Sequence, residues 1–130
     1  MKKAKSIYYL DDDYDDLDFF KEITEELGHT VKVFSDGRKM LHVLDIQDEK
    51  PDVIFLDIHM PVFNGEEILE IIKKTDVMKH IPVVMVSGAY PKKLLQHCSN
   101  MGVICVVKRH NFKEFKQNIE EVMKVFQISK

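Results

Sequence analysis

Polar side chains of complementary chemistry stand at the ends of the short apolar runs in this sequence. They are Asp11, Asp12, Asp57, Ser87 and Lys108. Any one of them alone is more often a helix cap, a turn residue or a solvated strand end than a ligand. Together they offer a carboxylate nucleophile, two further acids, a hydroxyl group and a cation. Such a set has the chemistry to accept a phosphoryl group on aspartate.

Three of these residues are acids, and crowded carboxylates raise one another's pKa unless a cation lies among them. The possible metal ligands in this set are all oxygen atoms, which favour a hard cation, Mg²⁺ or Mn²⁺. We expect Asp12 and Asp57 to bind it directly and Asp11 to act through water, with a backbone carbonyl just past Asp57 completing the shell. Lys108 and Ser87 would hold the phosphoryl oxygens. The neighbouring acids are interpreted instead as solvated charge and first-turn dipole partners: Asp13, Asp15, Asp16 and Asp18.

The elements that must position these residues are the strands of a parallel sheet. Val53–Asp57 is rich in branched and aromatic residues, which predicts a central strand buried on both faces. Thr30–Phe34 alternates polar with apolar residues, as is typical of a half-buried edge strand. The other expected strands are Ser6–Leu10, Ile81–Val86 and Val103–Val107.

Apolar residues at helical spacing follow each expected strand. They predict helices over residues 17–27, 40–44, 65–72, 91–100 and 111–126, with Gly28 as a stop, Asn111 as a cap and 127–130 as a frayed tail. The crossovers are long enough for right-handed βαβ units. The predicted fold class is therefore α/β, a parallel sheet with helices on both faces. Because the carboxyl ends of parallel strands share one edge, the polar residues above should meet there.

Length, composition and charge set the broad class of the protein. The 130 residues, 45% hydrophobic and 32% charged, fit one domain over 1–130 with a core of about 5–126. The net charge is -3, without the excess of positive charge typical of nucleic-acid-binding proteins, so direct nucleic-acid binding is disfavoured. No apolar run approaches the ~20 residues that are needed to cross a bilayer. Cys98 and Cys105 are interpreted as reduced, buried thiols. We expect no membrane partner and a cytoplasmic location.

As a set, these motifs resemble the receiver domains of two-component response regulators, of the stand-alone, chemotaxis-regulator-like kind. The resemblance spans essentially the whole chain. Its most specific block is Asp57 followed by Met60, Pro61 and Gly65, joined to an acid pair and a distal lysine. The matching segments are Leu10–Asp13, Leu56–Pro61 with Asn64 and Gly65, Met85–Gly88 and Val106–Lys108.

The resemblance implies a flavodoxin-like (βα)5 sandwich whose five-stranded parallel sheet has the order 2-1-3-4-5. It implies that Asp57 is the phospho-acceptor and that Asp11 and Asp12 are the acid pair. It also implies that His59 binds the metal through its main-chain oxygen. Ser87 and Lys108 would be the hydroxyl residue and the lysine that the family carries at these positions. The implied phosphoryl donor is a sensor histidine kinase or a histidine phosphotransfer protein. A downstream target protein would read the face built from the fourth helix, fifth strand and fifth helix, and we expect a monomer or weak dimer.

Some positions depart from the family pattern or carry smaller hypotheses. Arg109 follows Lys108 where the family has proline after a cis bond, and because a cis bond without proline costs about 3–4 kcal/mol we predict a trans bond. Cys105 stands where an aromatic switch residue is common. Tyr90 is a candidate for that role, against the simpler interpretation of a half-exposed loop tyrosine. The His59 side chain either overhangs the phosphoryl group and controls access of water or is a solvated loop histidine.

Two functions from other classes stay open. One is a Mg²⁺-dependent phosphatase or mutase with an aspartyl nucleophile, although such enzymes generally place a general-acid Asp where this chain has His59. The other is a degenerate receiver that acts only as a binding module. Under the receiver interpretation the chain is not a classical enzyme, although it promotes its own phosphotransfer and dephosphorylation. It is then either a diffusible shuttle or a phosphorelay intermediate.

Overall fold

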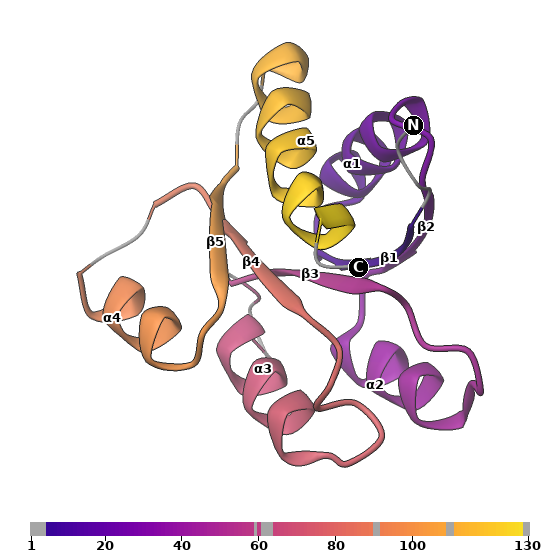
Figure 1. The fold of residues 1–130 in the computed structure, drawn as a ribbon, viewed down its shortest axis with the longest axis vertical. Coiled ribbons are helices and arrows are strands. Elements are labelled where there is room, and N and C mark those ends of the chain that lie inside the picture. Colours follow the sequence, from indigo (N-terminus) through magenta and orange to yellow (C-terminus); the bar gives the residue numbers. More distant parts are fainter. Residues whose placement is uncertain (1–4, 59, 61–63, 90–91, 109–110, 129–130) are drawn as a thin grey trace.

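Five parallel strands form one sheet with the order β2-β1-β3-β4-β5 (Figure 1). The structure, a computed structural model, describes residues 5–58, 60, 64–89, 92–108 and 111–128. The strands are β1 (Ser6–Leu10), β2 (Thr30–Phe34), β3 (Val53–Asp57), β4 (Val83–Ser87) and β5 (Ile104–Val107). The predicted α/β class and the strand order implied by the family resemblance are confirmed.

Helices follow the strands throughout the described part of the chain. They are α1 (Tyr14–Glu26), α2 (Gly37–Ile46), α3 (Gly65–Lys74), α4 (Lys92–Asn100) and α5 (Phe112–Ile128). In Figure 1, α1 and α5 lie over one face of the sheet, while α2 and α3 lie over the other and α4 stands beside the β5 edge. Within the described residues, none of the helices has the length and apolar character needed to cross a membrane.

The sheet separates two apolar clusters because successive side chains of a strand point to opposite faces. One cluster joins α1 and α5 to the sheet, through residues such as Phe20, Phe115, Tyr9 and Phe55. The other joins α2, α3 and α4 to it, through residues such as Met40, Ile68, Leu94 and Leu56. All five residues of β3 and of β4 are buried, whereas β2 alternates exposed and partly buried positions. The predicted central and edge strands are therefore confirmed.

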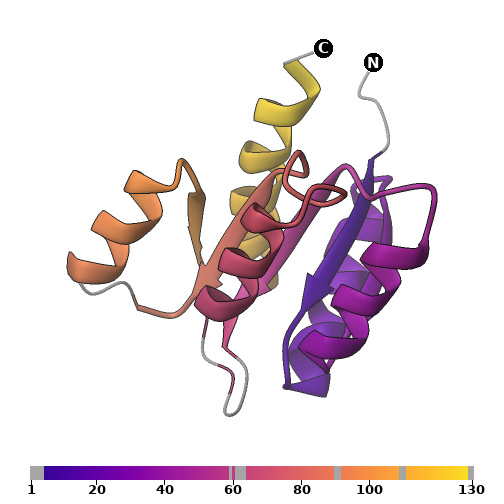
Figure 2. The ribbon, with the colours of Figure 1, turned by 90° about the horizontal axis from the view of Figure 1, so that it is seen from below.

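The register of the sheet places the ends of its strands at a common edge. Leu10 pairs with Leu56, and Ser87 pairs with Val107. The residues that end or directly follow β1, β3, β4 and β5 are therefore neighbours across the sheet, as expected for parallel strands. In Figure 2, β1, β3 and β4 all run toward the lower edge of the picture.

Element boundaries differ from the expected ones in small ways. The fourth strand begins at Val83 rather than Ile81, because Pro82 has no N–H for the ladder and contributes only its carbonyl to Ile54 at 2.9 Å. The last helix continues to Ile128 instead of ending in a tail that begins at residue 127. Asn111 caps that helix as predicted, accepting a hydrogen bond from the Glu114 backbone at 3.0 Å.

Candidate functional site

Three carboxylates gather at the carboxyl edge of the sheet. Asp11 and Asp12 follow β1 and Asp57 ends β3, and one oxygen of each lies within 4.8 Å of the others. Asp11 and Asp57 are buried, whereas Asp12 is exposed. The three acids therefore lie together, as predicted from the sequence. The roles assigned to them stay predictions.

Asp11 is the most tightly held acid of the cluster. Its Oδ2 accepts hydrogen bonds from the Tyr9 hydroxyl at 2.6 Å and from Lys108 Nζ at 2.7 Å, and its Oδ1 accepts one from the Asp13 backbone at 3.0 Å. Burial alone would raise the pKa of this carboxyl, but the hydrogen bonds from Lys108, Tyr9 and Asp13 outweigh burial and lower it. Asp11 is therefore held as a charged carboxylate.

Lys108 places its ammonium group among three acids. Its Nζ lies 2.7 Å from Asp11 Oδ2, 2.7 Å from Asp16 Oδ2 and 3.4 Å from Asp57 Oδ2. Burial would lower the pKa of this side chain, which is 15% exposed, but the hydrogen bonds to Asp11 and Asp16 raise it well above its usual range. The lysine therefore carries a permanent positive charge at the site.

Asp57 is positioned by β3 and by the glycine that begins α3. A side chain on Gly65 would place its Cβ 2.5 Å from the Asp57 backbone oxygen, so only glycine fits against this residue. Asn64 caps α3 through a capping box with Glu67, at 3.0 and 3.1 Å. The sequence Asn64-Gly65 thus fixes the start of α3 directly behind the proposed acceptor.

Ser87 lies at the end of β4 and is fully buried. Its hydroxyl donates to the Ala89 carbonyl at 2.7 Å and accepts from the Ala89 backbone N–H at 3.2 Å. In this arrangement the hydroxyl is engaged by its own loop. The structure thus brings Ser87 to the predicted edge without giving its hydroxyl a contact to Asp57.

Two residues of the site were missed or misassigned from the sequence. The prediction that Asp16 is solvated charge is wrong, since its side chain is 24% exposed and pairs with Lys108. Helical spacing could have indicated this, because Asp16 lies in the first turn of α1, next to the acid pair. Tyr9 is missed because its apolar run indicates only a strand. Residues two apart in a strand share a face, which places its hydroxyl beside Asp11.

Four of the sequence-based hypotheses fall on residues outside the described ranges. They concern the metal-binding carbonyl and the side chain of His59, the switch role of Tyr90 and the peptide bond before Arg109. All four stay predictions. Cys105, by contrast, is described and lies half-buried in β5.

The donors of the cluster fit a hard divalent cation better than any softer metal. Carboxylate oxygens come from Asp11, Asp12 and Asp57, and neither histidine nor cysteine joins the group found among the described residues. Oxygen-only sites suit Mg²⁺ or Mn²⁺. The exposed Asp12 leaves the cluster open to solvent on one side, so a bound Mg²⁺ or Mn²⁺ would be able to keep water ligands there.

Comparisons with known proteins agree with this architecture. Residues 7–120 match the sequence model of the response regulator receiver domain. The chain is 31% identical to the polar-differentiation response regulator DivK of Brucella anthropi over 86 aligned residues. This alignment covers 65% of this chain and 67% of DivK. The phosphorylated cyanobacterial phytochrome response regulator RcpA superposes with a TM-score of 0.81 at 27% identity, over 98% of this chain and 96% of RcpA. The Mn²⁺-bound form of response regulator Rcp1 superposes with a TM-score of 0.80 at 23% identity, over 95% of each chain.

The sheet order and the flanking helices define a flavodoxin-like α/β protein with an acidic site at the carboxyl edge of its sheet. The family match covers most of the chain, so the chain belongs to the response regulator receiver domain family of two-component signalling. The resemblance drawn from the sequence is thereby confirmed. Receiver domains are signalling domains rather than classical enzymes, and they interact with histidine kinases or phosphotransfer proteins.

Proposed function

We propose that this protein accepts a phosphoryl group on Asp57 from a phosphohistidine of a sensor histidine kinase or a histidine phosphotransfer protein. The observation that carries the proposal is the meeting of three carboxylates and one ammonium group at a single sheet edge: Asp11, Asp12, Asp57 and Lys108. A carboxylate oxygen of Asp57 bonds to phosphorus while the N–P bond of the donor breaks, and its electron pair stays on the donor imidazole. Attack of water on phosphorus later returns the carboxylate and releases phosphate.

The acid cluster would hold Mg²⁺ or Mn²⁺ through Asp11, Asp12 and Asp57, with the main-chain oxygen of His59 as a further ligand. A bound cation of this kind neutralises negative charge on the transferred group. Asp12 is exposed, so its carboxylate is free to turn toward the cation without breaking core contacts. The Asp11 carboxylate is held in one orientation by three hydrogen bonds.

Lys108 and Ser87 are the proposed contacts of the phosphoryl oxygens. Lys108 Nζ lies 3.4 Å from Asp57 Oδ2, close enough to reach an oxygen of a group attached to that carboxylate. The Ser87 hydroxyl reaches a second oxygen only by leaving the Ala89 carbonyl. That exchange of hydrogen bonds would release Ala89 from Ser87, and the phosphoryl group would thereby favour one of two arrangements.

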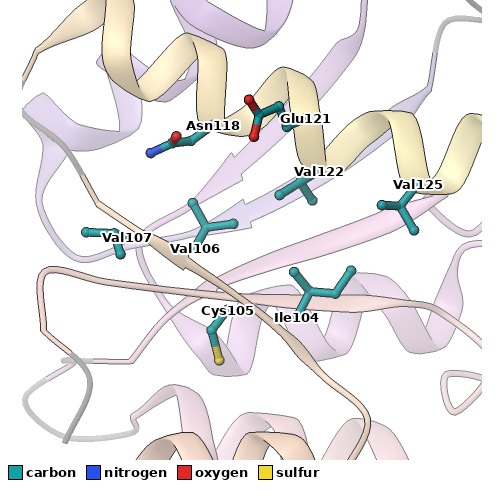
Figure 3. A pocket seen from close by; sticks show the side chains of 8 residues that line it. All are labelled: Ile104, Cys105, Val106, Val107, Asn118, Glu121, Val122 and Val125. Atoms are coloured by element: carbon teal, nitrogen blue, oxygen red, sulfur yellow. The ribbon is translucent and has the colours of Figure 1, made fainter.

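The proposed output is a protein–protein contact on the α4-β5-α5 face. A hollow of about 360 Å³ lies between β5 and α5 (Figure 3). Ile104, Val122 and Val125 give it apolar walls, while Asn118 and Glu121 add polar groups from α5. A surface that combines apolar and polar groups in this way suits a protein partner.

Incubation with a small phosphodonor such as acetyl phosphate and Mg²⁺, followed by intact mass spectrometry, tests the proposal. One added phosphoryl group that Asp57→Asn abolishes is the expected result. Asp45→Asn is the matched control, because Asp45 is an exposed acid on α2, and it should be modified as the wild type is. Release of free phosphate without a modified protein would instead indicate a phosphatase, and no addition would indicate a binding module.

A further inference from the structure

The ammonium group of Lys108 contacts two acids at the same distance. Its Nζ lies 2.7 Å from Asp11 and 2.7 Å from Asp16, whereas Asp57 is more distant at 3.4 Å. Asp11 stands within the acid cluster described above, but Asp16 lies outside that cluster and comes from α1. The ammonium group is therefore shared between the site of the proposed acceptor and a carboxylate that has no place among the proposed metal ligands.

Both anchors of the Asp16–Lys108 pair are fixed by the fold. Asp13 caps α1 and accepts a hydrogen bond from the Asp16 backbone at 3.3 Å, and Leu17 buries the helix against the sheet. On the other side, the Lys108 backbone N–H donates to the Ser87 carbonyl at 2.8 Å. With both backbones held, the flexible lysine side chain is the part that moves when the charge at the site changes.

We propose that Asp16 is a positioning residue that holds Lys108 in the unmodified state and competes with the phosphoryl group for its ammonium. The inference rests on the proposed function of Asp57. A phosphoryl group on Asp57 adds negative charge close to Nζ, and Lys108 turns toward it by giving up the 2.7 Å contact with Asp16. Asp16 therefore slows the modification of Asp57, because part of the attraction between Lys108 and the incoming group is offset by the contact that is lost.

Asp16→Asn removes the charge and keeps the shape of the side chain. Because Asp16 is one of three acids that share Lys108, we expect phosphorylation by acetyl phosphate to become about fivefold faster, which corresponds to about 1 kcal/mol in the barrier. Asp16→Glu keeps the charge and should restore a rate close to that of the wild type. Asp18→Asn removes the same charge from an exposed position on the same helix, so it should leave the rate unchanged.

The measurement is the initial rate of Asp57 modification by intact mass, at a Mg²⁺ concentration that saturates each variant. A second readout is the ¹⁵N–¹H signal of the Lys108 amino group in the unmodified protein, which reports its partners directly. Asp16→Asn should shift this signal and broaden it through faster exchange with water, whereas Asp18→Asn should leave it in place. Thermal unfolding of all variants shows whether the fold is kept.

Each outcome separates this inference from the proposed function. If the wild type takes no phosphoryl group, the proposed function is wrong and this inference falls with it. If the wild type is modified but Asp16→Asn reacts at the same rate or more slowly, only the role of Asp16 is overturned. An equal acceleration in Asp18→Asn, or an unmoved Lys108 signal in Asp16→Asn, also overturns it, because the effect would then be general charge rather than a contact.

Discussion

Tyr9 links the apolar core to the acid cluster. Its ring is fully buried and stacks on Phe20 with centroids 4.0 Å apart, while its hydroxyl donates to Asp11 at 2.6 Å. Burial and then the charge of Asp11 raise the pKa of this phenol well above its usual range, so it remains a donor. A single side chain thus fixes the orientation of an acid through packing on one end and a hydrogen bond on the other.

Tyr9→Phe should lower the free energy of unfolding by about 2 kcal/mol without changing the fold, because it removes a buried hydrogen bond to a charged acceptor and leaves the ring stacked. Urea denaturation without divalent metal measures this. Tyr8→Phe is the matched control, since Tyr8 belongs to the cluster on the opposite face of β1 and should cost much less. Equal losses in the two variants would contradict the importance of the Asp11 contact.

Gly65 is the residue whose substitution should disturb the acceptor most directly. In Gly65→Ala the new Cβ would meet the Asp57 carbonyl oxygen at 2.5 Å and the Ile58 Cα at 3.1 Å, both of them backbone atoms. We expect a loss of about 1–3 kcal/mol in the free energy of unfolding, measured by denaturant. Gly88→Ala is the control, because nothing lies within 4 Å of the added Cβ, and a comparable loss there would show that the effect is not one of crowding.

At the scale of elements, α4 and β5 meet through their cysteines. Cys98 of α4 is buried, and Cys105 of β5 is half-buried with its sulfur directed away from α5 (Figure 3). Burial, and after it the hydrogen bond and charge of the neighbouring Cys98, raise the pKa of the Cys105 thiol to about 12. The thiol is therefore protonated at neutral pH, and its reactivity reports how closely α4 packs on β5.

Cys105 should react with iodoacetamide at neutral pH at least about a hundredfold more slowly than the unfolded chain, because only the thiolate attacks. The rate should rise as the pH increases toward 12, where the thiolate becomes abundant. Cys98→Ala should accelerate the reaction, since it removes one cause of the raised pKa. Intact mass after timed quenching gives the rates, and fast labelling of the folded wild type would show that α4 does not cover this position.

Across the whole molecule, the sequence predicted what depends on local pattern and missed what depends on meetings between distant segments. The apolar run of β3 and its terminal Asp57 identify the central strand, and the alternation along β2 identifies an edge. The parallel topology then places Asp11, Ser87 and Lys108 at one edge. Neither the pairing of Asp16 with Lys108 nor the attachment of Ser87 to Ala89 has such a signature, because each depends on side-chain directions set only by packing.

Folding itself creates the acid cluster, so a cation that binds it should stabilise the whole molecule. Asp11, Asp12 and Asp57 lie together only in the folded chain, and a ligand that binds only the folded state adds about 2.7 kcal/mol at a free concentration one hundred times its dissociation constant. Lys108 already neutralises part of the cluster, so the Mg²⁺ needed to reach that value is higher than for three unpaired acids. Urea unfolding across a Mg²⁺ series, with a chelator as the zero point, measures the gain.

Asp12→Asn should reduce that Mg²⁺-dependent gain strongly, because Asp12 is the exposed acid of the cluster and loses a ligand oxygen with its charge. Asp45→Asn, an exposed acid on α2, should keep the full gain. If the two variants gained equally, Mg²⁺ would be acting on the general negative charge of the chain, and the cluster would not be its site. A gain confined to proteins with all three acids would tie metal binding, fold stability and the environment of Asp57 to the same sheet edge.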